Sequence, residues 1–184
     1  AIDKVTGAAM HSGDFHMDGM VYAKVLWPEI YPARISALDF SEAENAPGVV
    51  RIITRKDIKT GTNLAAVFEP YDRPVLVGVG EEVRFAADAI ALVVAESEDA
   101  AQRARDLIKV TYEPLKGIHT VEQAVSEEVP FIEKHIEKGD IAKGLQEAAV
   151  IVEDTYITPY VEHAYLEPEA GYAYVDNNGT INVC

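Results

Sequence analysis

The chain has 184 residues, of which 48% are hydrophobic and 26% are charged, so it can bury a core and is not expected to be disordered. Lysine and arginine total 16 against 31 aspartates and glutamates, and the net charge of −15 argues against nucleic-acid and anionic-membrane partners, which need basic surfaces. The one cysteine, Cys184, excludes an internal disulfide and a cysteine-based zinc or iron–sulfur site, and it fits a reducing cytoplasm.

The first third of the chain predicts three strands and two short helices, one helix before the third strand and one after it. Residues 20–26, 34–40 and 49–54 are rich in β-branched and other apolar side chains, which favours strands. Ser41 and Glu44 have capping-box spacing, so a short helix is expected there, and Thr54 is expected to cap a second short helix.

The middle third predicts a long loop followed by a strand–helix–strand unit. Residues 60–73 form the loop; residues 74–77 and 82–85 are short strands around a glycine turn. The apolar run 89–95 is too short to span a bilayer, and within it residues 90–95 predict a central strand buried on both faces. Ser97 caps the next helix, whose apolar stripe is Ala100, Ala101, Ala104, Leu107 and Ile108. A strand over 109–112 completes a βαβ-type unit, with a right-handed crossover if the strands are parallel.

The last third begins with a polar linker that contains one short helix. Asp140 is expected to cap a helix that ends near residue 148, and residues 149–157 predict a strand. Residues 171–175 and 180–183 flank Asp176-Asn177-Asn178-Gly179, which is a strong hairpin signal. The chain ends at Cys184, inside the second arm of this predicted hairpin.

One histidine and three carboxylates crowd into residues 161–170, namely Glu162, His163, Glu167 and Glu169. On a helix, His163 and Glu167 would share a face and could begin a metal site. However, prolines bracket the segment and no second histidine lies at ligand spacing. A general acid/base pair from Glu162 and Glu169 is the second interpretation. The favoured one is structural, with His163 and Glu167 satisfying backbone groups at a domain junction.

Two other regions carry candidate residues. His11 and His16 lie near Asp14 and Asp18, but the surrounding glycines favour a surface turn over a metal loop. Phe68 lies in the long loop, where an aromatic side chain either fills a core or faces a ligand or partner. The serines have no nucleophile-elbow context, so the sequence gives covalent catalysis no support.

Several phrases, in order, resemble the molybdenum-binding subunit of the xanthine dehydrogenase and aldehyde oxidoreductase family. They are Asp3-Lys4-Val5-Thr6-Gly7, Gly19-Met20-Val21-Tyr22-Ala23-Lys24-Val25, Pro47-Gly48-Val49-Val50, Val83-Arg84-Phe85, Ala91-Leu92-Val93-Val94-Ala95-Glu96, Val110-Thr111-Tyr112-Glu113-Pro114-Leu115 and Glu162-His163-Ala164-Tyr165-Leu166-Glu167-Pro168-Glu169. Each phrase alone is weak, but their order and spacing across nearly the whole chain make the match specific.

The resemblance implies an α+β (mixed α/β) fold. An α/β-hammerhead domain would cover residues 1–115 and a linker residues 116–139. The first strands and helix of a molybdopterin-binding domain would cover residues 140–184, and the cluster of Glu162, His163, Glu167 and Glu169 is interpreted as a junction where this domain begins. The sequence departs from the family at Ala87-Asp88-Ala89, where members often have Gly-Glu-Pro or Gly-His.

The family's full enzymes hydroxylate purines, other N-heterocycles or aldehydes, and water supplies the oxygen. The resemblance implies a molybdenum–molybdopterin cofactor, iron–sulfur clusters and in many members FAD. The iron–sulfur and FAD carriers would lie on other domains or subunits, the partners of this chain along with a small-molecule substrate. No catalytic, cofactor-binding or metal-binding residue is assigned in this chain, because the glycine-rich pterin phrases and the catalytic glutamate would lie beyond Cys184. Val67 and Phe68 occupy the place of a family loop that lines the substrate channel.

Three functional interpretations follow. The first is the N-terminal fragment of a molybdenum hydroxylase, inactive by itself. The second is a stand-alone binding or assembly module with a hammerhead fold and no catalysis. The third is a small metal-dependent enzyme built on His163 and its neighbouring carboxylates.

Overall fold

A computed structural model of the chain describes residues 2–59, 73–129, 134–165 and 169–184. These residues fall into two compact units: residues 17–123 form one unit, and residues 2–16 together with 124–184 form the other. Among the helices of the described ranges, none has the length and apolar character needed to cross a membrane.

The unit of residues 17–123 contains two three-stranded sheets in which every strand pair is antiparallel. The first sheet has the order β1-β5-β3, made by Tyr22–Leu26, Ala91–Ala95 and Val49–Ile53. The second has the order β4-β2-β6, made by Glu82–Val83, Ala33–Asp39 and Lys109–Pro114. The helices are α2 (Ser41–Glu44), the 3-10 turn η2 (Arg55–Asp57) and α3 (Glu98–Leu107).

Strand β5 is the centre of the first sheet, as its apolar sequence predicts. Its residues alternate between buried and half-buried, and Val93 is completely buried against Ala43, Ala104 and Ile108. A second cluster in this unit includes the fully buried Ile35. These two clusters share the half-buried Leu26 and Val110 at their edges, and a third, of Ala95, Ala100 and Ala101, joins β5 to the helix that follows it.

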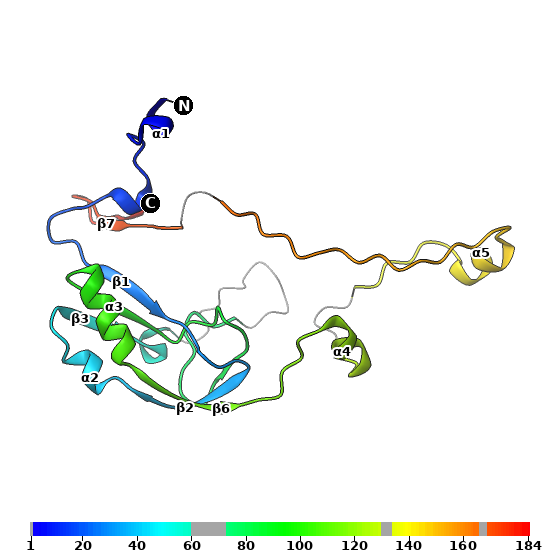
Figure 1. Cartoon of the computed structure of the whole chain (residues 1–184), viewed down its shortest axis with the longest axis horizontal. Helices are drawn as coiled ribbons and strands as arrows, with labels where there is room; N and C mark the ends of the chain where they lie inside the picture. Colours follow the sequence, from blue (N-terminus) through cyan, green and yellow to red (C-terminus); the bar gives the residue numbers. More distant parts are fainter. Residues whose placement is uncertain (1, 60–72, 130–133, 166–168) are drawn as a thin grey trace. The chain divides into compact units, whose positions relative to one another are not determined.

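Helix α3 lies against the first sheet (Figure 1) and begins where the sequence predicts. The Ser97 side chain accepts a hydrogen bond from the Ala100 N–H at 3.2 Å, which satisfies one of the free donors of the first turn. The buried side of the helix consists of small alanines, so its backbone comes close to its neighbours. Gly48 has φ +82°, which side chains rarely adopt, and a Cβ built on it would lie 3.1 Å from the Ala100 Cβ, a tight contact, so both the backbone and the space favour glycine here. Leu107, expected on the buried stripe, is instead 37% exposed.

The predicted βαβ-type unit is wrong in its pairing. The strands before and after α3, β5 and β6, belong to different sheets, and β6 pairs antiparallel with β2. A strand's own side chains report how it is buried but not which strand it pairs with. That choice depends on contacts between residues far apart in the sequence.

Two shorter elements also differ from expectation. The strand expected over residues 74–77 is absent, and only Pro74 forms an isolated β-bridge. The strand expected over 82–85 is shorter than predicted, because β4 contains only Glu82–Val83. Helix α2 forms at the expected place but without a serine cap, because Ser41 is its first residue and its N–H donates to Asp39 Oδ1 at 2.9 Å.

The second unit contains α1 (Ile2–Thr6), the 3-10 turn η1 (Ser12–Asp14), α5 (Ile141–Glu147) and the hairpin strands β7 (Ala173–Val175) and β8 (Ile181–Val183). Helix α4 (Val121–Ser126) spans the border between the two units. Asp140 caps α5 as predicted, since its side chain accepts a hydrogen bond from the Lys143 N–H at 2.9 Å.

The predicted hairpin is also confirmed. Asp176 Oδ1 accepts hydrogen bonds from the N–H groups of Asn178 and Thr180, and Gly179 has φ +80°. A glycine in this left-handed position is what a tight turn between antiparallel strands requires.

The strand predicted over residues 149–157 is not formed within the described part of the chain. These residues have no ladder of backbone hydrogen bonds and are exposed. The β-branched composition gives the segment a preference for extended backbone, but a strand needs a partner for its N–H and C=O groups.

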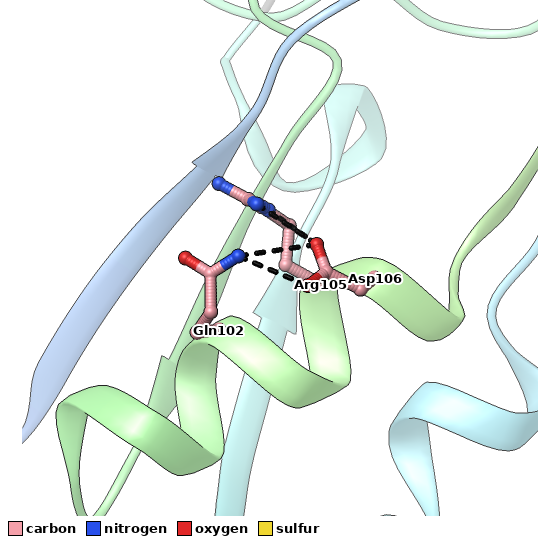
Figure 2. Close-up of polar contacts among 3 residues, drawn as sticks. All are labelled: Gln102, Arg105 and Asp106. Atoms are coloured by element: carbon pink, nitrogen blue, oxygen red, sulfur yellow. Dashed lines mark hydrogen bonds and ion pairs between the residues drawn. The ribbon is translucent and has the colours of Figure 1, made fainter.

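Helix α3 carries a small polar cluster of the half-buried Gln102 and Arg105 and the exposed Asp106 (Figure 2). Gln102 Nε2 donates to both oxygens of Asp106 at 3.0 and 3.2 Å, and Arg105 donates to Asp106 Oδ1. Hydrogen bonds from Gln102, followed by those from Arg105, lower the pKa of Asp106 below its usual value. These bonds favour the ionised carboxylate. Their contribution to stability is therefore present above the unfolded-state pKa of Asp106 and is lost as the pH falls through its folded-state pKa.

Replacing Gln102 by alanine should raise the pKa of Asp106 back toward its usual value, because the largest cause of the shift is removed. A carboxyl titration followed by NMR measures this directly. The Asp57 carboxyl, whose pKa is lowered chiefly by the Thr54 N–H, is a control in the same unit and should keep its pKa in the variant. An unchanged Asp106 pKa would contradict the prediction.

Candidate functional site

The segment around His163 is irregular backbone, so His163 does not lie on a helical face. Its ring stacks on the Tyr165 ring with centroids 5.6 Å apart, and the Ala164 N–H donates to Glu162 Oε1 at 3.3 Å. Ala164 has φ +51°, in the left-handed region that residues other than glycine rarely adopt. Glu162 therefore supports a local turn here.

The described members of the cluster do not form a catalytic arrangement. Glu162, His163 and Glu169 are all exposed, and no hydrogen bond joins the two carboxylates. General acids and bases are normally tuned by burial and by close charged neighbours, and these groups lack the burial. Glu167 lies outside the described residues, and the junction role of this cluster stays a prediction.

The metal hypotheses find no support in the described part of the chain. No group of three or more His, Cys, Asp and Glu side chains there could hold a metal ion. The turn near the N-terminus is closed by its own hydrogen bonds, because Asp14 Oδ2 accepts from the His11 N–H at 2.9 Å. This confirms the surface turn that its glycines favour.

Val67 and Phe68, the candidates for the substrate channel, lie in the range 60–72, outside the described residues. Their assignment to a substrate channel stays a prediction.

One chemically unusual residue was missed by sequence reasoning, namely Asp88. It precedes β5 and is only 2% exposed. Its Oδ2 accepts a hydrogen bond from the Arg84 N–H at 2.7 Å, whereas its Oδ1 is buried without a hydrogen-bond partner. The sequence does contain a signal for it, because Asp88 stands among three alanines just before the most apolar run of the chain. A carboxylate at such a place is expected to accept hydrogen bonds from nearby backbone N–H groups.

The chain thus contains two antiparallel sheets joined by an alanine-lined helix, followed along the sequence by an extended segment and a hairpin. Residues 6–116 match the family described as "Aldehyde oxidase and xanthine dehydrogenase, a/b hammerhead domain". Residues 121–184 match the family described as "Molybdopterin cofactor-binding domain". The domain boundaries predicted at residues 115 and 139 stay predictions.

Curated relatives agree with both matches. The chain is 36% identical to the nicotinate dehydrogenase large molybdopterin subunit of Eubacterium barkeri, over all of this chain and 44% of that subunit. It is 33% identical to one subunit of a probable xanthine dehydrogenase of Bacillus subtilis, over 96% of this chain and 24% of that protein. The xanthine dehydrogenase molybdenum-binding subunit of Escherichia coli O157:H7 is 28% identical, over all of this chain and 26% of that subunit. The chain thus spans less than half the length of these relatives.

Solved structures show the same fold. The aldehyde oxidoreductase of Desulfovibrio desulfuricans matches 99% of this chain with a TM-score of 0.80 and 27% identity, over 22% of its own length. The quinoline 2-oxidoreductase of Pseudomonas putida matches 67% of this chain with a TM-score of 0.58 and 28% identity, over 16% of its own length. The chain belongs to the molybdenum hydroxylase family of xanthine dehydrogenases and aldehyde oxidoreductases. More particularly, it comprises the hammerhead domain and part of the cofactor-binding domain of a molybdenum-binding subunit.

The described residues that match the cofactor-binding family do not by themselves enclose a cofactor. From residue 124 onward none of them is buried, and they comprise one short helix, a hairpin and extended exposed backbone. A molybdopterin site needs a shielded cradle of hydrogen-bond donors around its phosphate and ring groups. We therefore assign no cofactor contact to these described residues.

Proposed function

We propose that the chain is the N-terminal part of a xanthine dehydrogenase-like molybdenum hydroxylase that acts on a purine, another N-heterocycle or an aldehyde. The reaction replaces a C–H bond of the substrate by C–OH, and water supplies the oxygen. Two electrons leave through iron–sulfur clusters and in many family members FAD, on partner domains or subunits, and two protons are released. The single observation that carries this proposal is the pair of family matches, which together cover nearly the whole chain.

The exposed segment that follows α5 supports a larger assembly. Its large apolar side chains are between 61% and 104% exposed, namely Val150, Ile151, Val152, Tyr156, Ile157, Tyr160 and Val161. Large apolar side chains exposed in this number are normally covered by other polypeptide. Further polypeptide of the same enzyme would supply that cover, as would a partner of a binding module, so the choice between these two interpretations depends on the family matches.

Metal analysis and isotope labelling test the proposal. The 184-residue chain should purify without stoichiometric molybdenum, whereas the chain joined to the remaining part of a molybdenum-binding subunit should contain it. In water labelled with ¹⁸O, the longer protein should place ¹⁸O in the hydroxylated product. A longer protein that binds molybdenum but draws its oxygen from dioxygen would contradict the proposed reaction.

We further propose that Val67 and Phe68 line the substrate channel of the complete enzyme. Replacing Phe68 by alanine should then change KM or substrate preference, by roughly 10-fold or more, because the proposed aromatic contact with the substrate would be lost. Steady-state kinetics of the complete enzyme on several N-heterocycles and aldehydes measure the effect. Phe85→Ala is the control, since Phe85 lies in the 17–123 unit outside this loop and is 41% exposed. Unaltered kinetics in Phe68→Ala would refute this role.

A further inference from the structure

The N-terminal segment of the chain is an ordered piece with its own turns. Helix α1 is followed by the turn η1, which is closed by two hydrogen bonds between His11 and Asp14. The Asp14 N–H donates to the His11 carbonyl oxygen, and the Asp14 side chain accepts from the His11 N–H. Phe15 follows this turn directly on extended backbone and is 40% exposed. The turn therefore fixes the backbone from which the Phe15 side chain projects.

The C-terminal hairpin presents an aromatic face. Backbone hydrogen bonds between Tyr172 and Cys184, at 3.0 and 2.9 Å, extend the β7–β8 ladder by one pair. Tyr172 and Tyr174 are two residues apart on one strand, so their rings share a face, and they stack with centroids 6.4 Å apart. A two-stranded hairpin is marginally stable by itself, so this face needs something to pack on it.

The N-terminal segment supplies that packing. The Phe15 ring lies against the Tyr172 ring with centroids 4.9 Å apart and a tilt of 34°, a favourable aromatic geometry. A Cβ built on Gly13 would lie 3.6 Å from the Ala170 Cβ, in ordinary contact distance. Figure 1 shows the N-terminal segment beside β7, and both belong to the same compact unit.

We infer that residues 2–16 are a structural part of the cofactor-binding domain, docked through Phe15 on the tyrosine face of its hairpin. The domain is then discontinuous, and the hammerhead is an insertion joined to it by two connections instead of one. This reassigns residues 6–16, which the hammerhead family match includes. The inference depends on contacts within one unit and holds whether or not the proposed enzymatic reaction is correct.

Hydrogen exchange on the full chain tests the inference through the Phe15→Ala variant. Loss of the aromatic contact should speed exchange of the Tyr172, Asp176 and Cys184 amides, all of which are hydrogen-bonded in the hairpin, by roughly 2- to 10-fold. Exchange of the Val93 amide in β5 should not change, because it lies in the other unit. Phe15→Tyr should restore the slower exchange.

Met10→Ala is the matched control, since Met10 is 61% exposed in the same segment. It should leave the hairpin amides as they are. A second readout is the NMR shift of the Tyr172 ring protons, which should move in Phe15→Ala because the neighbouring ring current disappears. Unchanged hairpin exchange with unchanged Tyr172 shifts would overturn the inference, as would equal effects of Met10→Ala and Phe15→Ala.

Discussion

Replacing Ile35 by alanine is expected to destabilise the 17–123 unit by about 2–5 kcal/mol, the usual cost of truncating a fully buried isoleucine. Ile35 is 0% exposed in β2, the central strand of the second sheet, and packs in a cluster with Val77, Val83 and Ile90. Its backbone is held as well, because Gly80 N–H donates to its carbonyl oxygen. The surroundings cannot move in easily to fill the cavity. Urea unfolding followed by circular dichroism measures the loss.

Ile136→Ala is the control for this prediction because it makes the same chemical change at a site that is 92% exposed. Its effect should stay within about 0.5 kcal/mol, as for most surface substitutions. If Ile35→Ala costs as little as Ile136→Ala, the cluster around Ile35 is not the core of this unit.

Replacing Asp88 by alanine is expected to cost about 1–3 kcal/mol, because the partly buried Arg84 N–H loses its acceptor. Asp88→Asn keeps a side-chain oxygen for that N–H and removes a charge that is buried with one unpartnered oxygen, so its cost should be below about 1 kcal/mol. The same urea unfolding measurement compares the two variants.

Asp18→Ala provides the reference for loss of an exposed aspartate in the same unit and should be nearly neutral. Equal losses in Asp88→Asn and Asp88→Ala would mean that the charge itself, paired with Arg84 at 3.7 Å, stabilises the turn. The assignment of Asp88 as a backbone cap would then be wrong.

Local features were predictable because their causes are local. Ser97 and Asp140 cap α3 and α5 as expected, since each cap needs only a short side chain and the N–H groups two or three residues later. The hairpin at Asp176 was predictable for the same reason. The family was also recognisable from the sequence, because the resemblance depends only on short sequence segments and their order along the chain.

Pairing was not predictable. The sequence shows that β5 is apolar and central but not that β6 leaves its sheet to pair with β2. Residues 149–157 have strand composition, but no described segment supplies a partner for them. The cluster at Glu162 and His163 is interpreted from the sequence as structural, at a domain junction, with an acid/base pair as the second interpretation, because neighbours in sequence need not meet in space. The described residues there are exposed and form only a local turn.

By itself the sequence determined the family, the mixed α/β class, the caps of α3 and α5 and the hairpin turn, since each follows from residue types at short or ordered spacing. The tertiary structure alone decided the partition into two antiparallel sheets, the burial of Asp88 and the packing of Phe15 on Tyr172. These depend on which distant segments meet, and many pairings satisfy the same local preferences with similar energies. Only the packing of the whole unit selects among them.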